Sequence, residues 1–178
     1  MLIVLSQKVD SNSDYEDDLF NVYHYPSRYR NQIHEGDTFV YYQGNRYDKT
    51  QRYYFGTGIV DKIACQDEEN YYATLLHGRK FEKKIPIYLP DDGYIEQLGY
   101  DTIRKSINPP WQSSVRPISE TAYNYILEHA GKLLEIVSIE DLKEGLKEAI
   151  RAFYIGGDDS EILQIVNLSK KIAKLLGK

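Results

Sequence analysis

Tyrosine, serine and arginine side chains gather in one stretch near the start of the chain, HYPSRYRNQIHEGDTFVYYQG at residues 24–44. Flat rings stack on nucleobases, arginines contact phosphates, and short polar groups hydrogen-bond to the edges of bases. Tyrosine also favours β-strands, where its ring packs against neighbouring strands. The stretch therefore indicates either a surface that binds nucleic acid or a sheet whose strands pair through tyrosines.

Residue types needed for other common chemistries are present, but not at the required spacing. The histidines His24, His34, His77 and His129 form no pair at the spacing of a zinc site. The sequence contains no G-x-S-x-G nucleophile elbow, no Walker loop and no G-x-G-x-x-G loop. Cys65 ends an apolar run and is expected to be a buried small residue. We therefore expect neither a metal nor a cofactor.

One arrangement of charged residues is compatible with a nuclease. Glu82 and Lys84 form a Glu-x-Lys pair, and Asp67 precedes them. Metal-dependent nucleases hold an Asp and a Glu-x-Lys on adjacent strands, so that two carboxylates bind the metal and the lysine polarises the scissile phosphate. The same pattern occurs in edge strands that lysines protect against aggregation. Both interpretations stay open at this point.

Length, composition and charge indicate a globular protein of one domain with a small appendage. The 178 residues are 42% hydrophobic and 28% charged, with a net charge of −5. Residues 1–23 carry one Lys against five acids, a net −4, whereas residues 24–56 carry five Lys or Arg against three acids, a net +2. A local basic region can bind a polyanion even in an acidic protein.

The single cysteine and the N-terminal residues bear on localisation. One cysteine excludes an internal disulfide and favours a reduced, cytoplasmic protein. The apolar run at residues 2–5 is too short for a signal peptide or a membrane-spanning helix. We therefore expect no membrane association.

Hydrophobic periodicity predicts an α+β protein, in which a small, mostly antiparallel sheet or barrel precedes helices. A short helix is expected at residues 27–33 with Ser27 as its cap, a helical turn at residues 17–23, and a further short helix at residues 100–107. From Ser119 onward the pattern is helical. Strands are expected at residues 2–6, 38–44, 53–65, 70–78 and 83–89.

Two motifs in order, YHYPSRYRNQIHEGDTFVYYQG and YYFGTGIVDKI, resemble the EVE-type domains of the PUA superfamily, relatives of YTH and SRA-like readers. The most similar versions are N-terminal specificity modules of modification-dependent restriction systems, including those fused to HNH nucleases. The resemblance covers roughly residues 1–130. The segments that carry it are LIVLSQ (2–7), YHYPSRYRN (23–31), EGDTFVYYQG (35–44), YFGTGIV (54–60) and SVRPISETAYNYIL (114–127).

The resemblance implies a PUA-like, mostly antiparallel β-barrel flanked by helices at residues 1–130, followed by a helical extension at residues 131–178. It implies a module that recognises a modified, methylated base flipped out of nucleic acid, with DNA favoured over RNA. Such a module is the specificity part of a restriction or defence system. It has no catalytic activity of its own and acts with a nuclease or another effector. The alternatives are the nuclease described above and an RNA-binding or protein-interaction domain of the same fold.

The resemblance also implies which residues form the site. Tyr41 and Tyr42 alternate between the faces of a strand, so only one of them can point into a pocket. Trp111, the only tryptophan, is expected to supply a lid. The expected base-binding residues are Ser6, Gln7, Tyr25, Ser27, Tyr29, Tyr41, Tyr42, Phe55 and Trp111. The expected phosphate-binding residues are Arg28, Arg30, Arg46 and Arg52.

Overall fold

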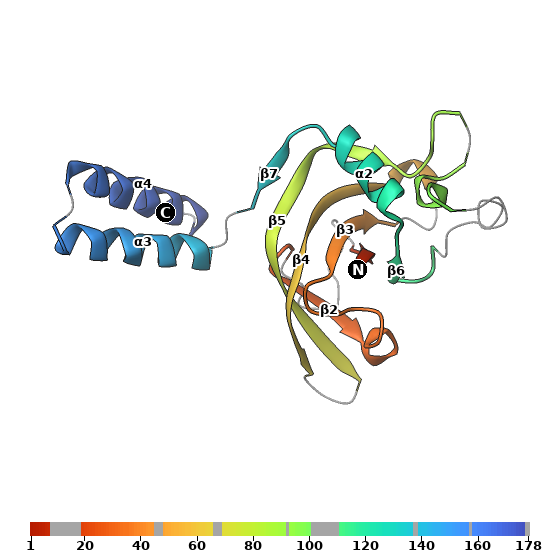
Figure 1. Cartoon of the computed structure of the whole chain (residues 1–178), viewed down its shortest axis with the longest axis horizontal. Helices are drawn as coiled ribbons and strands as arrows, with labels where there is room; N and C mark the ends of the chain where they lie inside the picture. The colour runs from red at the N-terminus through yellow and green to blue at the C-terminus, as the bar shows by residue number, and fades with distance from the viewer. Residues whose placement is uncertain are drawn as a thin grey trace. The chain divides into compact units, whose positions relative to one another are not determined.

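A curled β-sheet organises the first part of the chain (Figure 1). The computed structural model describes residues 1–7, 19–44, 48–65, 69–91, 93–100, 111–136, 139–156 and 158–176. The chain divides into two compact units, Met1–Ile136 and Val137–Lys178. We call them the sheet unit and the helical hairpin and describe each by itself.

The sheet follows the order β2-β5-β4-β3-β1-β6, and β7 pairs with β5 as a branch. β1 runs parallel to β3, and the other pairs are antiparallel. The fold is therefore α+β with a curled, mostly antiparallel sheet, as the periodicity predicted. The strands are β1 Leu2–Ser6, β2 Val22–Pro26, β3 Thr38–Gln43, β4 Tyr53–Cys65, β5 Asn70–Pro86, β6 Val115–Pro117 and β7 Leu133–Glu135.

Each face of the sheet carries its own apolar core, because successive side chains of a strand point to opposite faces. Helix α2, Glu120–His129, covers one face with Ala122 and Ile126, and the side chain of Ser119 caps its first turn. The core on this face contains Val4, Val40, Tyr42, Tyr54, Phe81, Ile85, Ile87, Ile95, Ile118, Ala122, Ile126 and Ala130. The core on the other face contains Ile3, Leu5, Phe20, Tyr23, Tyr25, Tyr29, Ile33, Phe39, Tyr41, Tyr53, Phe55, Val60, Ala73, Leu75 and Val115.

The two strands predicted at residues 70–78 and 83–89 are in fact one strand, β5, over Asn70–Pro86. Between the two predicted strands the sequence reads RKFE, where three charged residues interrupt the apolar pattern. The backbone bends here without breaking, since His77 adopts a φ of 52° and Gly78 lies under the ring of Phe20. Register shifts in the pairing of β4 with β5 accompany the bend.

Several shorter elements also differ from the prediction. The residues from Leu19 to Asn21 form a turn that leads into β2, so the helical turn expected at 17–23 is wrong. The helix expected at 27–33 shortens to a 3₁₀ turn, Ser27–Tyr29, without a side-chain cap. Cys65 is exposed at the end of β4, not buried. The helix expected at 100–107 lies almost entirely outside the described residues.

The helical hairpin consists of α3, Ile139–Tyr154, and α4, Asp159–Leu175, which pack against each other. The side chain of Asp158 accepts a hydrogen bond from the backbone of Ser160, and Glu161 completes a capping box at the start of α4. Leu142 and Ala149 of α3 are buried. Among the described residues, no helix has both the length and the apolar character needed to cross a membrane.

Candidate nucleic-acid interface

The two ends of the curled sheet are linked by tyrosine side chains. β2 and β6 end the strand order. The hydroxyl of Tyr23 on β2 donates to the backbone oxygens of Ser6 and Ser114, over 3.3 and 3.4 Å. The backbone N–H of Ser114, just before β6, donates to the hydroxyl of Tyr29 over 3.0 Å. We call Ser6, Tyr23, Tyr29 and Ser114 the edge junction, since side chains rather than strand pairing bring the edges together there.

Hydrogen bonds from neighbouring serines and a nearby arginine act on the phenol of Tyr29. Burial by itself raises the pKa of Tyr29, but hydrogen bonds from the backbone and side chain of Ser114 and from the side chain of Ser113 outweigh it, and the charge of Arg28 adds to them. The net result is a pKa below the ordinary value for tyrosine. The edge junction is therefore a polar, electropositive environment.

Two exposed arginines extend from the 3₁₀ turn beside the edge junction. The guanidinium carbon of Arg28 lies 4.9 Å from the ring centroid of Tyr29. Nη1 of Arg30 donates to the backbone oxygen of Ser27 over 3.3 Å. Both side chains are exposed, so their guanidinium groups remain accessible to an anion such as a phosphate.

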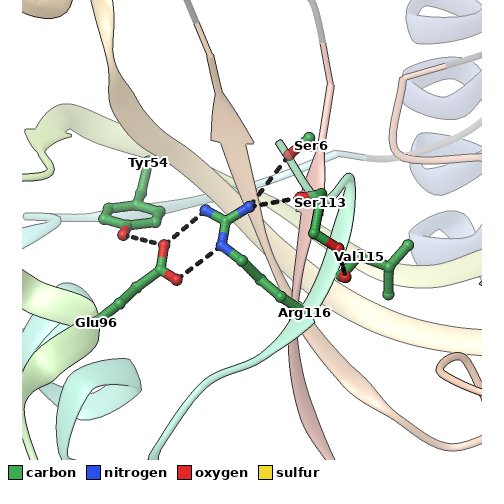
Figure 2. Close-up of polar contacts among 6 residues, drawn as sticks. All are labelled: Ser6, Tyr54, Glu96, Ser113, Val115 and Arg116. Atoms are coloured by element: carbon green, nitrogen blue, oxygen red, sulfur yellow. Dashed lines mark hydrogen bonds and ion pairs between the residues drawn. The ribbon is translucent and has the colours of Figure 1, made fainter. Parts of the chain in front are cut away.

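The side chain of Ser6 also contacts a buried ion pair, Arg116 with Glu96 (Figure 2). Nε and Nη2 of Arg116 donate to the two carboxylate oxygens of Glu96 over 2.7 and 2.6 Å. The hydroxyl of Tyr54 donates to the same carboxylate over 2.7 Å. Nη1 of Arg116 donates to Ser6 Oγ over 3.3 Å and to the backbone oxygen of Ser113 over 3.0 Å. Arg116 thus holds the end of β1 and the segment before β6 in fixed positions.

Two aromatic rings flank the Arg116 guanidinium. Its carbon lies 4.6 Å from the ring centroid of Tyr42 and 5.4 Å from that of Trp111. Burial by itself lowers the pKa of Arg116, but the Glu96 carboxylate more than offsets this, so the pKa is raised. Arg116 is only 2% exposed. It is a fixed cation that orients the site and does not itself face solvent.

Of the six rings expected to line a pocket, five are buried and one is half-buried. The rings of Tyr41 and Phe55 stack at 5.2 Å with an interplanar angle of 4°. Trp111 is the half-buried ring, and it packs against Tyr42 at 5.7 Å. The buried rings are Tyr25, Tyr29, Tyr41, Tyr42 and Phe55. Tyr41 and Tyr42 point to opposite faces of the sheet, as alternation predicted.

Other residues of the predicted site meet at the same end of the sheet. Ser6 pairs with Tyr42 at the ends of β1 and β3, and the backbone N–H of Gln7 donates to the oxygen of Tyr42 over 2.9 Å. Arg52, just before β4, is close enough for its charge to act on Tyr42. Arg46 lies outside the described residues.

No family model matches the chain, and no curated protein matches it.

The residues of the nuclease alternative have structural contacts where the structure describes them. The Glu82 carboxylate accepts a hydrogen bond from the backbone N–H of Lys132 over 3.0 Å. The Lys84 ammonium lies 4.3 Å from the ring centroid of Tyr53. Asp67 lies outside the described residues. Within the described part of the chain, no three His, Cys, Asp or Glu residues gather as metal ligands.

Sequence reasoning did not single out several residues that organise the site. It gives no role to Glu96, Ser113, Ser114 or Arg116, although the last two lie in SVRPISETAYNYIL (114–127), a segment that carries the resemblance. Arg116 gave one usable signal, because it is a charged residue between apolar neighbours in VRPI. No local pattern indicates its partner, since Glu96 is twenty residues away in the sequence.

Proposed function

We propose that this chain is a nucleic-acid-binding module that recognises a modified, flipped-out base at the edge junction. The observation that carries the proposal is the meeting of three distant segments, at Ser6, Tyr29 and Ser114, beside the exposed arginines Arg28 and Arg30. Tyrosine, serine and arginine side chains together provide stacking, base-edge hydrogen bonds and phosphate contacts.

The site divides these tasks among its residues. Arg28 and Arg30 contact the phosphates on either side of the extruded nucleotide. The serine hydroxyls of Ser6 and Ser114 bind the polar edge of the base. Trp111 is half-buried, and its ring centroid lies 5.4 Å from the guanidinium carbon of Arg116, which contacts Ser6. The Trp111 ring stacks on the face of the base. The Arg116–Glu96 pair keeps these groups in place before the ligand arrives.

The energy balance requires both stacking and polar contacts. Extruding a base costs a few kcal/mol, and aromatic stacking returns about 1–3 kcal/mol. A methyl group in apolar contact adds roughly 0.8 kcal/mol, which is less than a tenfold preference. Strong discrimination therefore depends on hydrogen bonds that the unmodified base cannot satisfy.

The EVE-type resemblance supplies the finer part of the proposal. It favours a PUA-like barrel, methylated DNA as the ligand, and a restriction or defence system in which a nuclease or another effector acts on the bound DNA. The curled, mostly antiparallel sheet is compatible with a small barrel. Glu82 and Lys84 of the nuclease alternative have structural contacts, with the backbone of Lys132 and with the ring of Tyr53, so binding is the function we propose.

A binding panel tests the proposal. Dissociation constants are measured at one salt concentration for oligonucleotides that contain no modification, 5-methylcytosine, 5-hydroxymethylcytosine or 6-methyladenine, each as DNA and as RNA. We expect one modified DNA to bind at least tenfold more tightly than its unmodified counterpart. Equal affinity for all oligonucleotides, or no binding, would contradict the proposal. A preference for RNA would move the function to RNA recognition.

A further inference from the structure

Helix α4 has an apolar surface that the helical hairpin does not bury. Asp159, Ile162, Leu163, Val166 and Lys170 follow one another at helical spacings of i, i+3, i+4, i+7 and i+11, so they lie on one face. Ile162, Leu163 and Val166 are 43%, 62% and 41% exposed. We call these five residues the outer face of α4.

The side of α4 that packs on α3 is a different one. Ile165, Leu168 and Ile172 are half-buried, and the Leu168 side chain approaches Gly145 of α3. α4 therefore has two apolar stripes, of which the hairpin uses only one. A helix with a second apolar stripe is typical of a bundle with more helices than two.

The end of α3 enlarges the apolar surface near the turn that joins the helices. Phe153 is 39% exposed, Tyr154 82% and Ile155 87%. Exposed apolar side chains that gather in one region mark interaction sites, and aromatic residues are enriched in the centres of interfaces.

The charges along α4 indicate what covers the outer face. Acids occupy its first turn and the cap, at Asp158, Asp159 and Glu161, whereas lysines occupy its last turns, at Lys170, Lys171 and Lys174. Two such helices attract each other when they lie antiparallel, because the acidic end of each then meets the basic end of the other. A parallel arrangement brings like charges together.

We propose that the outer face of α4 packs antiparallel against the same face of a second copy of this chain. The two-fold axis passes between Leu163 and Val166, so that each Leu163 contacts the second copy's Val166. In this register Asp159 faces Lys170 of the second copy, and the pair forms twice. Among the described residues, neither Asp159 nor Lys170 forms an ion pair within its own chain. The contact is isologous, so it closes at a dimer.

The mass of the full chain in solution tests the proposal first. Sedimentation velocity at increasing protein concentrations should show a species of twice the chain mass, in reversible exchange with the monomer. Val166→Glu should shift the protein to monomer, while Gln164→Glu, which places the same charge on another exposed side of α4, should leave the dimer intact. A wild-type protein that stays monomeric at all concentrations would overturn the proposal.

A charge swap tests the antiparallel register. Asp159→Lys and Lys170→Asp should each weaken dimerisation at least tenfold, and the double variant should restore it. Residues eleven positions apart in a helix are separated by about 16 Å, so the restored pair cannot form within one chain. Circular dichroism checks that each variant keeps its helices. A double variant no more dimeric than the single variants would contradict this register.

Discussion

At the scale of single residues, Arg116 connects the parts of the candidate site. Its guanidinium binds Glu96 through two nitrogens and Ser6 and Ser113 through the third. Placing both charges out of water is costly, and the bidentate geometry with the additional hydrogen bond from Tyr54 offsets that cost. Removing either partner leaves an unpaired buried charge.

We therefore expect Arg116→Met to lower the free energy of unfolding by about 3–5 kcal/mol. The double variant Arg116→Met with Glu96→Leu should be more stable than Arg116→Met alone, because no charge then remains buried. Urea-induced unfolding of the three proteins measures this. If the double variant is less stable than the single one, the loss comes from packing and not from the unpaired carboxylate.

A second residue-scale prediction concerns the phenol of Tyr25. Burial raises its pKa to about 12, with Tyr71 and Cys65 contributing further. An ordinary tyrosine has a pKa of about 10 in the unfolded chain. Between about pH 10 and pH 12, Tyr25 therefore keeps its phenol proton in the folded protein but loses it in the unfolded chain. The contribution of Tyr25 to the free energy of unfolding is fully present below pH 10 and is lost as the pH rises toward 12.

The free energy of unfolding should be lower at pH 11.5 than at pH 9, and Tyr25 should account for about 2 kcal/mol of this decrease. Tyr25→Phe should remove that share of the pH dependence. At pH 7 the same variant should be at least as stable as the wild type, because the buried Tyr25 hydroxyl has no hydrogen-bond partner among the described residues. Tyr54→Phe is the matched comparison and should destabilise at pH 7, since it removes the bond to Glu96. An unchanged pH profile in Tyr25→Phe would refute the assignment.

At the scale of elements, glycines in β4 and β5 make room for one aromatic ring. A Cβ atom at position 56 would lie 2.4 Å from Cζ of Phe20, and one at position 78 would lie 2.8 Å from its Cβ. Phe20 reaches this place from a turn in which its own φ is 70°. The ring closes the core between the two long strands.

We expect Gly56→Ala to destabilise the sheet unit by about 1–3 kcal/mol through overpacking. Phe20→Leu removes the edge of the ring, so Gly56→Ala should cost less in a Phe20→Leu background than in the wild type. A double-mutant cycle from thermal or urea unfolding measures the coupling. Additive effects would mean that the ring does not restrict position 56.

Strands with strong apolar patterns could be predicted from the sequence, and bent or short ones could not. β1, β3 and β4 follow the predicted bounds to within one residue. β2 was missed because Tyr23, His24 and Tyr25 precede Pro26 without a clear apolar alternation. β7 was predicted as helix, since LLE continues the apolar spacing of α2, and Gly131, with a φ of 73°, ends that pattern.

The candidate site was predictable only where its residues lie close together in the sequence. The run from Tyr25 to Arg30 was identified because rings, serine and arginines are neighbours there. Ser114 and Arg116 join the site through the pairing of β6 with β1, which no local pattern specifies. The burial of Tyr41 and Phe55 likewise depends on rings from other strands.

At the scale of the whole molecule, the boundary between the two units shows where the chain can be shortened for an experiment. β7 lies within residues 131–178, where the resemblance implies a helical extension, and it pairs with β5 of the sheet. The backbone N–H of Ile136 also donates to the oxygen of Gly78. The natural end of the sheet unit is therefore Ile136.

A fragment of residues 1–136 should fold cooperatively and bind the same oligonucleotide as the full chain. Residues 137–178, which this fragment lacks, carry seven acids and seven bases, so they give phosphates no net attraction. A fragment of residues 1–130 should be less stable, because it loses β7 and the Lys132–Glu82 hydrogen bond. Loss of binding in a folded 1–136 fragment would place part of the interface in the tail.

The central claim is that Arg28 and Arg30 bind phosphate while the edge junction reads the base. The most direct measurement is the ratio of affinities for the preferred modified oligonucleotide and its unmodified counterpart, determined for wild type and variants over a salt series. Arg28→Gln or Arg30→Gln should weaken both ligands alike and reduce the salt slope by about one, with Arg79→Gln on β5 as the control. Trp111→Ala and Ser114→Ala should lower the ratio itself. A ratio unchanged in both of these variants, in proteins that remain folded, would contradict the account.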